Sequence, residues 1–191
     1  LLNRQPTLRR LDPDGTPDPA FPTSAGGSGT TQALAVESDG SVLHVGGLVG
    51  SFVRRVVAPG GSANAFSLLA NDLILTVAVM PDGKILVGGS FTLIGGQSRS
   101  RIARLNSDGT VDTSFSLIAN QTVTSLVVAP DGAVLVGGAF TQFGGFPRQS
   151  LARILPDGTV DAGFNPGVVG TVSCMVVQPD GSIVLGGSFS S

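Results

Sequence analysis

The sequence predicts an all-β fold, a β-propeller built from four-stranded blades, and two observations carry this prediction. Short runs of β-branched and other apolar residues flank Asp-Gly dipeptides, which signal β-hairpins because glycine accepts the positive φ of a tight turn. The hairpins also recur in pairs at a regular period. A phenylalanine closes the second hairpin of each pair, at Phe21, Phe66, Phe115 and Phe164, and these residues are 45, 49 and 49 positions apart. Repeats of about 40–50 residues with four strands each are typical of propeller blades.

The clearest repeat runs from Val77 to Phe115 and contains two hairpins. The first turns at Asp82-Gly83 between two apolar runs, and the second turns at Asp108-Gly109. A Gly-Gly pair ends each first hairpin, so we expect the first hairpins at the crowded centre of the ring, where small residues let strands converge. The pairs begin at Gly46, Gly88, Gly137 and Gly186.

The repeats fill the chain, and no segment shows helical periodicity. We therefore predict a single propeller domain over residues 1–191. Its first three blades are expected at about 32–66, 76–115 and 122–164, and its fourth at about 171–191 together with 1–21.

The fourth blade is predicted to join the two ends of the chain. Leu8–Phe21 is a second hairpin without a preceding first hairpin, and Val172–Phe189 is a first hairpin without a following second one. We predict that they pair, which would close a four-bladed ring and remove the exposed edges of its sheets. Two alternatives stay open: a four-repeat piece of a longer ring, or half of an eight-bladed dimer. The absence of an initiator Met and of a signal peptide leads us to expect a mature product or an excised piece.

The composition excludes several classes of protein. Apolar residues make up 41% of the 191 residues and charged residues 13%, so the chain is expected to fold around a core. The formal net charge of −2 and the scattered Lys and Arg give no reason to expect a nucleic-acid partner. No apolar run approaches the ~20 residues that cross a bilayer, so we expect no membrane insertion. The single Cys174 excludes an internal disulfide, and its apolar surroundings predict a buried, unreactive thiol.

Two motifs alternate along the chain. The first is P-D-G followed by an apolar run, Gly-Gly and Phe, and it occupies Pro81–Phe91, Pro130–Phe140 and Pro179–Phe189. The second is R-[LI]-x-x-D-G-T-x-D-x-x-F, and it occupies Arg10–Phe21, Arg104–Phe115 and Arg153–Phe164. Together they resemble the delta-60 repeat of bacterial secreted and cell-surface proteins. The resemblance implies a β-propeller at an extracellular or cell-surface location, and it implies no activity, since the family has none established. The first blade departs from the motifs at Pro59–Ala63 and at Val49, so we expect it to be distorted.

The aspartates of the hairpin turns have two interpretations. Asp12, Asp14 and Asp18 place oxygen atoms at a spacing similar to that of a calcium-binding loop. Another copy of the hairpin has Leu155 where a ligand would be needed. We therefore interpret these aspartates as structural turn residues, keep calcium as the alternative, and predict no other metal or cofactor.

An arginine recurs eleven residues before each closing phenylalanine, at Arg10, Arg55, Arg104 and Arg153. We predict that it pairs with the aspartate eight residues later, because opposite charges across two strands contribute roughly 0.2–1 kcal/mol. Arg55 has Ala63 at that position, so this pair is expected to be absent from the first blade. A ligand site lined by the four arginines is the alternative.

No motif in the sequence predicts catalysis. His44 is the only histidine, Glu37 is the only glutamate, and no nucleotide-binding or nucleophile motif is present. We predict that the protein is not an enzyme. A glycan-acting enzyme, which would use carboxylates, is the third of three functional hypotheses.

Charge divides the predicted ring into two faces. The hairpin turns point to one face and carry nearly all the acidic residues, whereas the loops of the opposite face contain Arg4, Arg99, Arg101 and Arg148. Because loops on a rigid scaffold commonly carry binding sites, we predict a non-enzymatic binding module whose loops bind an anionic protein or polysaccharide. The alternative is a structural subunit that stacks head to tail into a homo-oligomer or filament, helped by the apolar connector Ser67–Thr76.

Overall fold

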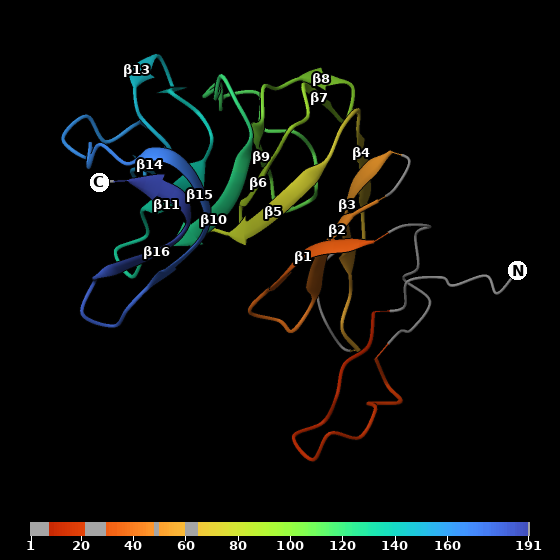
Figure 1. The fold of residues 1–191 in the computed structure, drawn as a ribbon. Coiled ribbons are helices and arrows are strands. Elements are labelled where there is room, and N and C mark those ends of the chain that lie inside the picture. Colours follow the sequence, from red (N-terminus) through yellow and green to blue (C-terminus); the bar gives the residue numbers. More distant parts are fainter. Residues whose placement is uncertain (1–7, 22–29, 48–49, 60–64, 191) are drawn as a thin grey trace, which may run out of the picture.

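The computed structural model describes residues 8–21, 30–47, 50–59 and 65–190, and every regular element within them is a β-strand (Figure 1). The all-β prediction is therefore confirmed. Within the described residues, no helix is present that could span a membrane. The strands are β1 (Thr31–Val36), β2 (Val42–Gly46), β3 (Ser51–Val56), β4 (Ser67–Ala70), β5 (Ile74–Val79), β6 (Ile85–Gly89), β7 (Leu93–Ile94), β8 (Gln97–Ser98), β9 (Ile102–Leu105), β10 (Val123–Val128), β11 (Val134–Gly138), β12 (Gln142–Phe143), β13 (Phe146–Pro147), β14 (Leu151–Ile154), β15 (Val169–Val177) and β16 (Ile183–Ser190).

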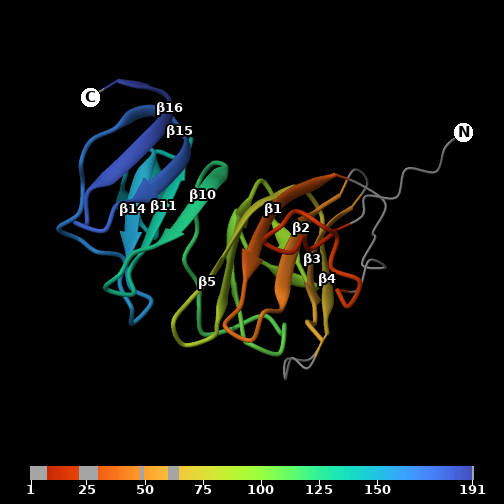
Figure 2. The ribbon, with the colours of Figure 1, turned by 90° about the horizontal axis from the view of Figure 1, so that it is seen from below.

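The strands form a series of antiparallel sheets arranged side by side in an arc (Figure 2). We call β1–β4 blade 1, β5-β6-β9 blade 2 and β10-β11-β14 blade 3, and β15-β16 stands as a two-stranded sheet at one end. Blades 2 and 3 share one design, in which a bridge from Leu105 to Val111, or from Ile154 to Val160, continues the sheet outward. The first strands of consecutive sheets are neighbours: β1 lies beside β5, β5 beside β10, and β10 beside β15.

The predicted hairpin turns are present at all seven Asp-Gly dipeptides of the described residues. The glycine of each turn has a positive φ of 79° to 89°. The aspartate Oδ1 accepts a hydrogen bond from the backbone N–H two residues later, as Asp14 does from Thr16 at 2.9 Å, and this contact fixes the turn. The same hydrogen bond forms at Asp39, Asp82, Asp108, Asp131, Asp157 and Asp180.

A β-bulge interrupts each first hairpin at the same place, a feature that the sequence motifs did not predict. In blade 2 the register shifts between Ile74 and Thr76. Equivalent shifts occur in the β1–β2, β10–β11 and β15–β16 pairs. A bulge increases the local twist of a strand pair, and its repetition gives the sheets a common shape that lets them stack.

The Gly-Gly pairs lie opposite these bulges, where backbones approach closely. A Cβ atom on Gly89 would lie 2.0 Å from the carbonyl oxygen of Leu73, so only glycine fits. The role predicted for the pairs is thus confirmed, but the alignment of Gly46 with Gly88 is wrong. Gly46 takes the place of Gly89, and Val45 takes the place of Gly88, because the Gly-Gly pair of the first repeat begins one residue further from its Asp-Gly turn than in the other repeats.

The hydrophobic core lies mainly between neighbouring sheets. The phenylalanines that close the second hairpins each pack toward the sheet that follows, and they stabilise the stack by filling these interfaces. Phe66 packs between blades 1 and 2, Phe115 between blades 2 and 3, and Phe164 between blade 3 and β15-β16. Phe21 does the same for the hairpin of residues 8–21, since it is buried against Val42 and Val56 of blade 1.

Blade 1 differs from blades 2 and 3, as its departures from the motifs predicted. Its β2–β3 connection covers only residues 47–50, whereas the equivalent connections cover 90–101 and 139–150 and contain additional short strands. Strand β4 pairs with β3 and then with β7, so the sheet of blade 1 continues into the connection of blade 2. Val49 and residues 60–64 lie outside the described residues.

The predicted pairing of the two terminal hairpins is not present in this structure. The hairpin of residues 8–21 lies against blade 1, whereas β15-β16 lies at the opposite end of the arc (Figures 1 and 2). Strand β16 pairs only with β15 among the described strands. The arc is therefore open in this structure.

The prediction that Cys174 is buried is wrong, because the thiol is exposed. Cys174 lies at the bulge of β15, in the position that Ser125 occupies in blade 3. Ser125 is buried by the sheet that follows it, β15-β16, but no sheet in the structure follows Cys174.

Candidate functional site

The candidate binding surface is the loop face, which we define by the short hairpins β7–β8 and β12–β13 and by the connectors 67–73 and 116–122. The two short hairpins project from the upper side of the molecule in Figure 1, and the Asp-Gly turns lie toward its lower side. Each short hairpin turns at a glycine pair with positive φ, at 55° and 75° for Gly95-Gly96 and at 56° and 85° for Gly144-Gly145. Two consecutive positive φ values are what a two-residue hairpin turn requires, so these positions need glycine or asparagine.

An asparagine in each connector fixes the short hairpin of the next blade. The Oδ1 of Asn71 accepts hydrogen bonds from the N–H groups of Thr92 and Leu93, both at 2.9 Å, and its Nδ2 donates to Thr92 Oγ1 at 2.8 Å. Asn120 makes the same three bonds to Thr141 and Gln142. The loop face is therefore held rigidly to the scaffold.

Sequence reasoning missed this pair of asparagines. Asn71 and Asn120 are 49 residues apart, the same period as the phenylalanines, so the repeat carried the signal. Their side chains had no apparent partner in the sequence, because the threonines that they contact lie 21 residues further along the chain.

Two of the predicted site arginines are tied to the backbone of their own blade. Arg148 is buried and donates to the carbonyl oxygens of Pro147, Asp161 and Ala162 at 2.8, 3.1 and 2.9 Å. Arg99, its equivalent in blade 2, donates to the carbonyl oxygens of Ser98 and Asp112 at 2.7 and 3.3 Å. Both arginines therefore connect a short hairpin to the outer hairpin of the same blade.

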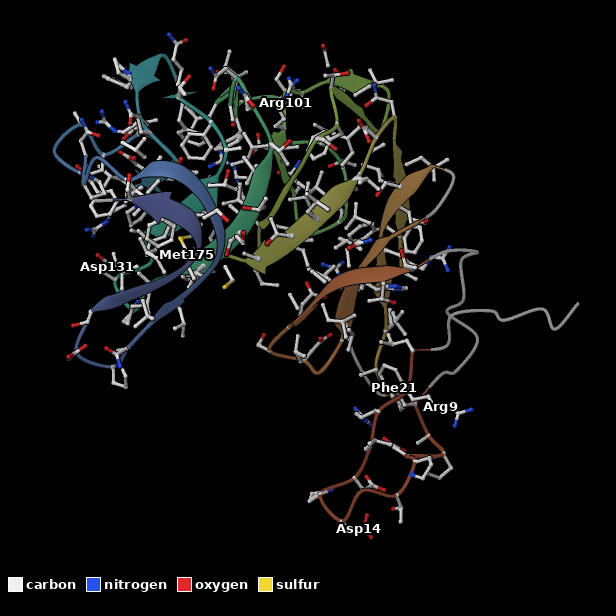
Figure 3. All side chains as sticks on the ribbon, viewed as in Figure 1. Arg9, Asp14, Phe21, Arg101, Asp131 and Met175 are labelled. Atoms are coloured by element: carbon white, nitrogen blue, oxygen red, sulfur yellow. The ribbon has the colours of Figure 1, made fainter. Side chains whose placement is uncertain are left out.

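The other two predicted arginines differ from these. Arg101 is half-buried, lies at the end of the molecule that carries the short hairpins (Figure 3), and has a positive φ of 65°. Within the described part of the chain its guanidinium makes no hydrogen bond or ion pair, so it is the arginine best placed to meet a ligand. Arg4 lies outside the described residues. The structure thus distributes these arginines over successive blades and does not gather them into one cluster.

Exposed apolar side chains accompany the arginines on the loop face. Leu69 and Ile118 occupy equivalent positions in the two connectors, and both are exposed. Leu93 on β7 and Phe146 on β13 are also exposed, and the guanidinium of Arg148 lies 5.5 Å from the centre of the Phe146 ring. The loop face therefore offers apolar contacts next to cationic groups.

The opposite face carries shallow cavities between neighbouring Asp-Gly turns. One, of about 300 Å³, lies between the turns at Asp131 and Asp180 and is also lined by Arg153, whose guanidinium pairs with Asp131. Another, also of about 300 Å³, lies between the turns at Asp82 and Asp131. Their charged groups are already committed to turns or to ion pairs, which leaves little polar capacity for a ligand.

Two of the three calcium candidates, Asp14 and Asp18, are engaged within their own hairpin, whereas Asp12 contributes its backbone N–H and carbonyl to the turn. Asp14 accepts hydrogen bonds from the hydroxyl and the N–H of Thr16, which lower its pKa. Asp18 accepts from the N–H of Ala20 at 2.8 Å and from Arg10 at 2.6 Å, and both contacts lower its pKa. The described residues contain no group of three or more His, Cys, Asp or Glu side chains arranged to hold a metal.

The predicted arginine–aspartate pairs are confirmed in all three hairpins. Arg10 Nε donates to Asp18 at 2.6 Å, and Arg104 Nε donates to Asp112 at 2.9 Å. In the third, Arg153 forms a longer ion pair with Asp161, at 3.8 Å from its Nε, and its guanidinium also pairs with Asp131.

These arginines also cover the phenylalanine that closes the hairpin. The guanidinium carbon lies 4.8 to 5.1 Å from the ring centre in the pairs Arg10–Phe21, Arg55–Phe66 and Arg104–Phe115. A cation over an aromatic face is stabilising, which supports a structural role for the recurring arginine.

Blade 1 replaces the missing aspartate with a different carboxylate. Arg55 donates to both carboxylate oxygens of Glu37, at 2.5 and 2.6 Å, and also to the carbonyl oxygen of Ser107 at 2.6 Å. Arg55 therefore forms an ion pair that the sequence did not predict, with a residue outside its own hairpin. The sole glutamate of the chain neutralises a buried guanidinium, so it is committed to the structure.

His44 is also committed to the interior of blade 1. Its Nε2 lies 2.9 Å from the Thr31 hydroxyl, and its ring meets Phe52 edge-on at 4.9 Å between ring centres. Burial, and then the charge of Arg54, lower the pKa of His44. No residue in these contacts forms a catalytic pair with the imidazole.

The most strongly perturbed carboxylate is Asp112. Burial by itself would raise its pKa, but hydrogen bonds from Ser114, Lys84 and Arg104 outweigh burial and hold the pKa well below its usual range. Lys84 Nζ lies 2.9 Å from Asp112 Oδ2, so the carboxylate bridges the two hairpins of blade 2. The Asp112 carboxylate is therefore fully engaged in hydrogen bonds, which indicates that it stabilises blade 2.

We expect Asp112→Asn to lower the free energy of unfolding at pH 7 by about 1.5–3 kcal/mol, as loss of charged hydrogen bonds does. The folded pKa is below the unfolded value of about 3.9, so this stabilisation is fully present above pH ~4 and is lost as the pH falls toward the folded pKa. Urea unfolding between pH 7 and pH 3 should show the two proteins converging. Asp161→Asn, at the equivalent position of blade 3, should lower the free energy of unfolding by less than about 1 kcal/mol. If the difference in stability between the unsubstituted protein and Asp112→Asn did not change with pH, the structural role assigned to the Asp112 carboxylate would be contradicted.

Comparison with known families agrees with this architecture. Four stretches, residues 3–21, 81–115, 129–164 and 178–191, match a family described as a domain of unknown function (DUF5122) β-propeller, and together they cover more than half of the chain. No curated protein matches the chain. The matched stretches are those that carry the alternating hairpin motifs and the Asp-Gly turns. The chain is therefore a member of the DUF5122 β-propeller family.

Proposed function

We propose that the chain is a non-enzymatic binding module whose ligand contacts the loop face. The observation that carries this proposal is the pair of short hairpins, each fixed by an asparagine and each bordered by exposed apolar residues. Rigid loops lose little conformational entropy on binding, which favours affinity. Most carboxylates of the chain are occupied by turns and ion pairs, which argues against a glycan-acting enzyme.

The ligand class that fits this surface best is an anionic polysaccharide or an anionic protein. Arg101 supplies a cation without a competing partner among the described residues, and Leu69, Ile118 and Phe146 supply apolar contacts. We further propose that the matched family corresponds to the delta-60 repeat, and that the protein acts at the cell surface or outside the cell in a bacterium. The alternating motifs support this assignment.

The test is binding of the full chain to a panel of anionic polysaccharides and surface proteins. Arg101→Ser should weaken binding about 1.5- to 5-fold, because an exposed ion pair contributes about 0.2–1 kcal/mol, and it should reduce the dependence of affinity on salt. Arg9→Ser is the matched control, since Arg9 is exposed on the hairpin of residues 8–21, away from the loop face. Equal loss in both variants, or hydrolysis of a polysaccharide, would contradict the proposal.

A structural role in an assembly is the second candidate, and the exposure of Leu69 favours it. Rings could stack with the acidic turns of one against the loop face of the next, as a heterologous contact. Leu68 packs partly into the core between blades 1 and 2, so Leu69 is the residue of the connector that a neighbour would cover. Leu69→Ser should dissolve such stacks at low salt without changing the fold, and stacks that persist in the variant would exclude this contact.

We also propose that the hairpin of residues 8–21 is the outer half of the blade whose inner half is β15-β16. The observation in favour is that each half has the local structure of its counterpart in blades 2 and 3.

A further inference from the structure

A cavity of about 480 Å³ lies between the outer parts of blades 2 and 3. Its walls come from residues 114–117 of blade 2, from the Asp157-Gly158 turn of blade 3 and from the short hairpin β12–β13. Sites for small ligands usually have volumes of about 300–1,000 Å³ and combine apolar walls with a few polar groups. The cavity has the size of such a site, and it lies in the middle of the arc, between two complete blades.

The equivalent place between blades 1 and 2 is covered by side chains. A Cβ atom on Gly109 would overlap the ring of Phe66, so this ring packs directly on the outer turn of blade 2. Arg55 Nη1 donates to the carbonyl oxygen of Ser107 in the same turn at 2.6 Å. An aromatic ring and a hydrogen-bonded guanidinium therefore occupy the junction of blades 1 and 2.

The junction of blades 2 and 3 is arranged differently. The atom nearest to a Cβ on Gly158 would be Nη1 of Arg104, at 2.7 Å, so a guanidinium lies over this turn in place of a ring. Phe115 packs against the guanidinium, with 4.8 Å from its ring centre to the guanidinium carbon. Arg104 Nε donates to Asp112 and Nη2 to Ser114, but Nη1 makes no hydrogen bond to any residue in the described part of the chain. The cavity wall therefore contains a donor that is free for a ligand.

The cavity also contains acceptors. Asp157 Oδ1 accepts hydrogen bonds from the hydroxyl and the N–H of Thr159, at 2.7 and 2.9 Å, and these bonds lower the pKa of Asp157. The carboxylate is therefore ionised at neutral pH, and its Oδ2 makes no hydrogen bond to the residues that the structure describes. Ser116 adds an exposed hydroxyl, which can donate and accept.

Apolar groups and balanced charges complete the cavity. Phe146 on β13 is 41% exposed, whereas Leu117 is partly buried and Val160 is buried. Among the described residues that line the cavity, Arg104 and Asp157 are the charged ones, so one positive and one negative charge face the ligand. This balance favours an uncharged ligand with both donors and acceptors.

From this arrangement we infer that the cavity binds an uncharged pyranose unit of a glycan. A pyranose has a face of C–H groups, which packs on the Phe146 ring, and hydroxyl groups at its rim, which both donate and accept. Arg104 Nη1 donates to one hydroxyl, and Asp157 Oδ2 accepts from another. Hydrogen bonds with a charged partner are the stronger kind, and a carboxylate or sulfate on the same sugar would be repelled by Asp157.

This inference rests on the proposed function, because the cavity borders the β12–β13 hairpin of the loop face and holds one unit of a glycan that lies across that face. An anionic polysaccharide can contain uncharged sugars between its charged ones. Arg101 then contacts a charged unit and the cavity an uncharged one. The two contacts use different residues, so they can be tested separately.

The first test is a titration of the full chain with uncharged oligosaccharides of glucose, galactose, mannose and N-acetylglucosamine, followed by nuclear magnetic resonance. We expect at least one of these sugars to shift the amide signals of Ser116 and Thr159. The repeat supplies the control, since Ser67 and Thr110 stand 49 residues earlier, at the junction of blades 1 and 2, and their signals should not move. No shift with any of these sugars, or equal shifts at both junctions, would overturn the inference.

The second test measures the affinity of variants for the oligosaccharide that gives the shifts. Asp157→Asn keeps the Oδ1 that fixes the turn but replaces the free acceptor by an amide donor, and it should weaken binding about 2- to 12-fold, the effect of one hydrogen bond. Phe146→Gln introduces the residue found at the equivalent Gln97, and it should weaken binding by removing the ring. Asp108→Asn makes the same change in the outer turn of blade 2 and should leave the affinity unchanged. Equal affinities for Asp157→Asn and Asp108→Asn would contradict the site.

The outcomes separate this inference from the proposed function. If anionic polysaccharides bind and Arg101→Ser weakens their binding, but no uncharged oligosaccharide shifts the cavity signals, the proposed function stands and the inference is wrong. If uncharged oligosaccharides enter the cavity and no anionic polymer binds, the cavity site stands and the anionic ligand is wrong. If an uncharged peptide shifts these signals and no sugar does, the cavity is a peptide site and the inference is overturned.

Discussion

Replacing Glu37 by Ala should lower the free energy of unfolding by about 3–5 kcal/mol, the cost of leaving a buried charge without its partner. The Arg55 side chain is only 2% exposed and donates two hydrogen bonds to this carboxylate. Water cannot replace the lost contact without opening the interface between blades 1 and 2. Urea unfolding followed by circular dichroism measures the change.

A matched comparison separates burial from the ion pair itself. Asp18→Ala removes the equivalent partner from Arg10, whose side chain is 43% exposed, and should lower the free energy of unfolding much less than Glu37→Ala does. The double variant Glu37→Met with Arg55→Met removes both charges and should be more stable than Glu37→Ala. Equal costs for Glu37→Ala and Asp18→Ala would show that burial of Arg55 does not matter.

Phe140→Ala should be about as destabilising, at about 3–5 kcal/mol, because it leaves a large cavity in the core between blades 2 and 3. The ring is fully buried and lies 5.4 Å from the ring of Phe143, centre to centre. The rigid turns on both sides limit how far the surrounding residues can collapse into the cavity. Thermal unfolding and urea unfolding should both report the loss.

The repeat itself supplies the control for this substitution. Phe189 stands 49 residues after Phe140, at the same place in the motif, but it is 36% exposed, at the open end of the arc. Phe189→Ala should lower the free energy of unfolding much less than Phe140→Ala does. A loss equal to that of Phe140→Ala would mean that the end of the arc is packed as tightly as its middle.

The sequence predicted the parts of the fold that depend on local chemistry. Each Asp-Gly turn requires a positive φ and an aspartate that accepts from the backbone, and both requirements can be read from the motif. The pairs Arg10–Asp18 and Arg104–Asp112 follow from register across one hairpin. The short hairpins and the bulges were missed because two-residue strands and one-residue shifts leave almost no pattern in an apolar run.

The parts that depend on contacts between blades could not be predicted in the same way. Glu37 reaches Arg55 from the other hairpin of blade 1, so no fixed spacing within a hairpin connects them. The closure of the ring was predicted from matching half-blades, but the angle between successive blades cannot be derived from the sequence. Arg99 and Arg148 were predicted to be cations available on the loop face. In the structure their guanidinium N–H groups donate to backbone carbonyl oxygens of the outer hairpin, which lie nearby only in the folded blade.

The order of contacts in the arc has a consequence for how the molecule unfolds. Among the described strands, each sheet makes its main contacts with the sheet before it and the sheet after it, from β1 to β5, β10 and β15. The free energy of such an array is approximately a sum of unit terms and nearest-neighbour terms, so local opening begins at units with one neighbour and spreads inward. Amide hydrogens of β16 and of the hairpin at residues 8–21 should then exchange with solvent fastest, and those of β5 and β6 slowest. A thermal transition of the single chain would be broad, and joining the ends would sharpen it by giving every unit two neighbours.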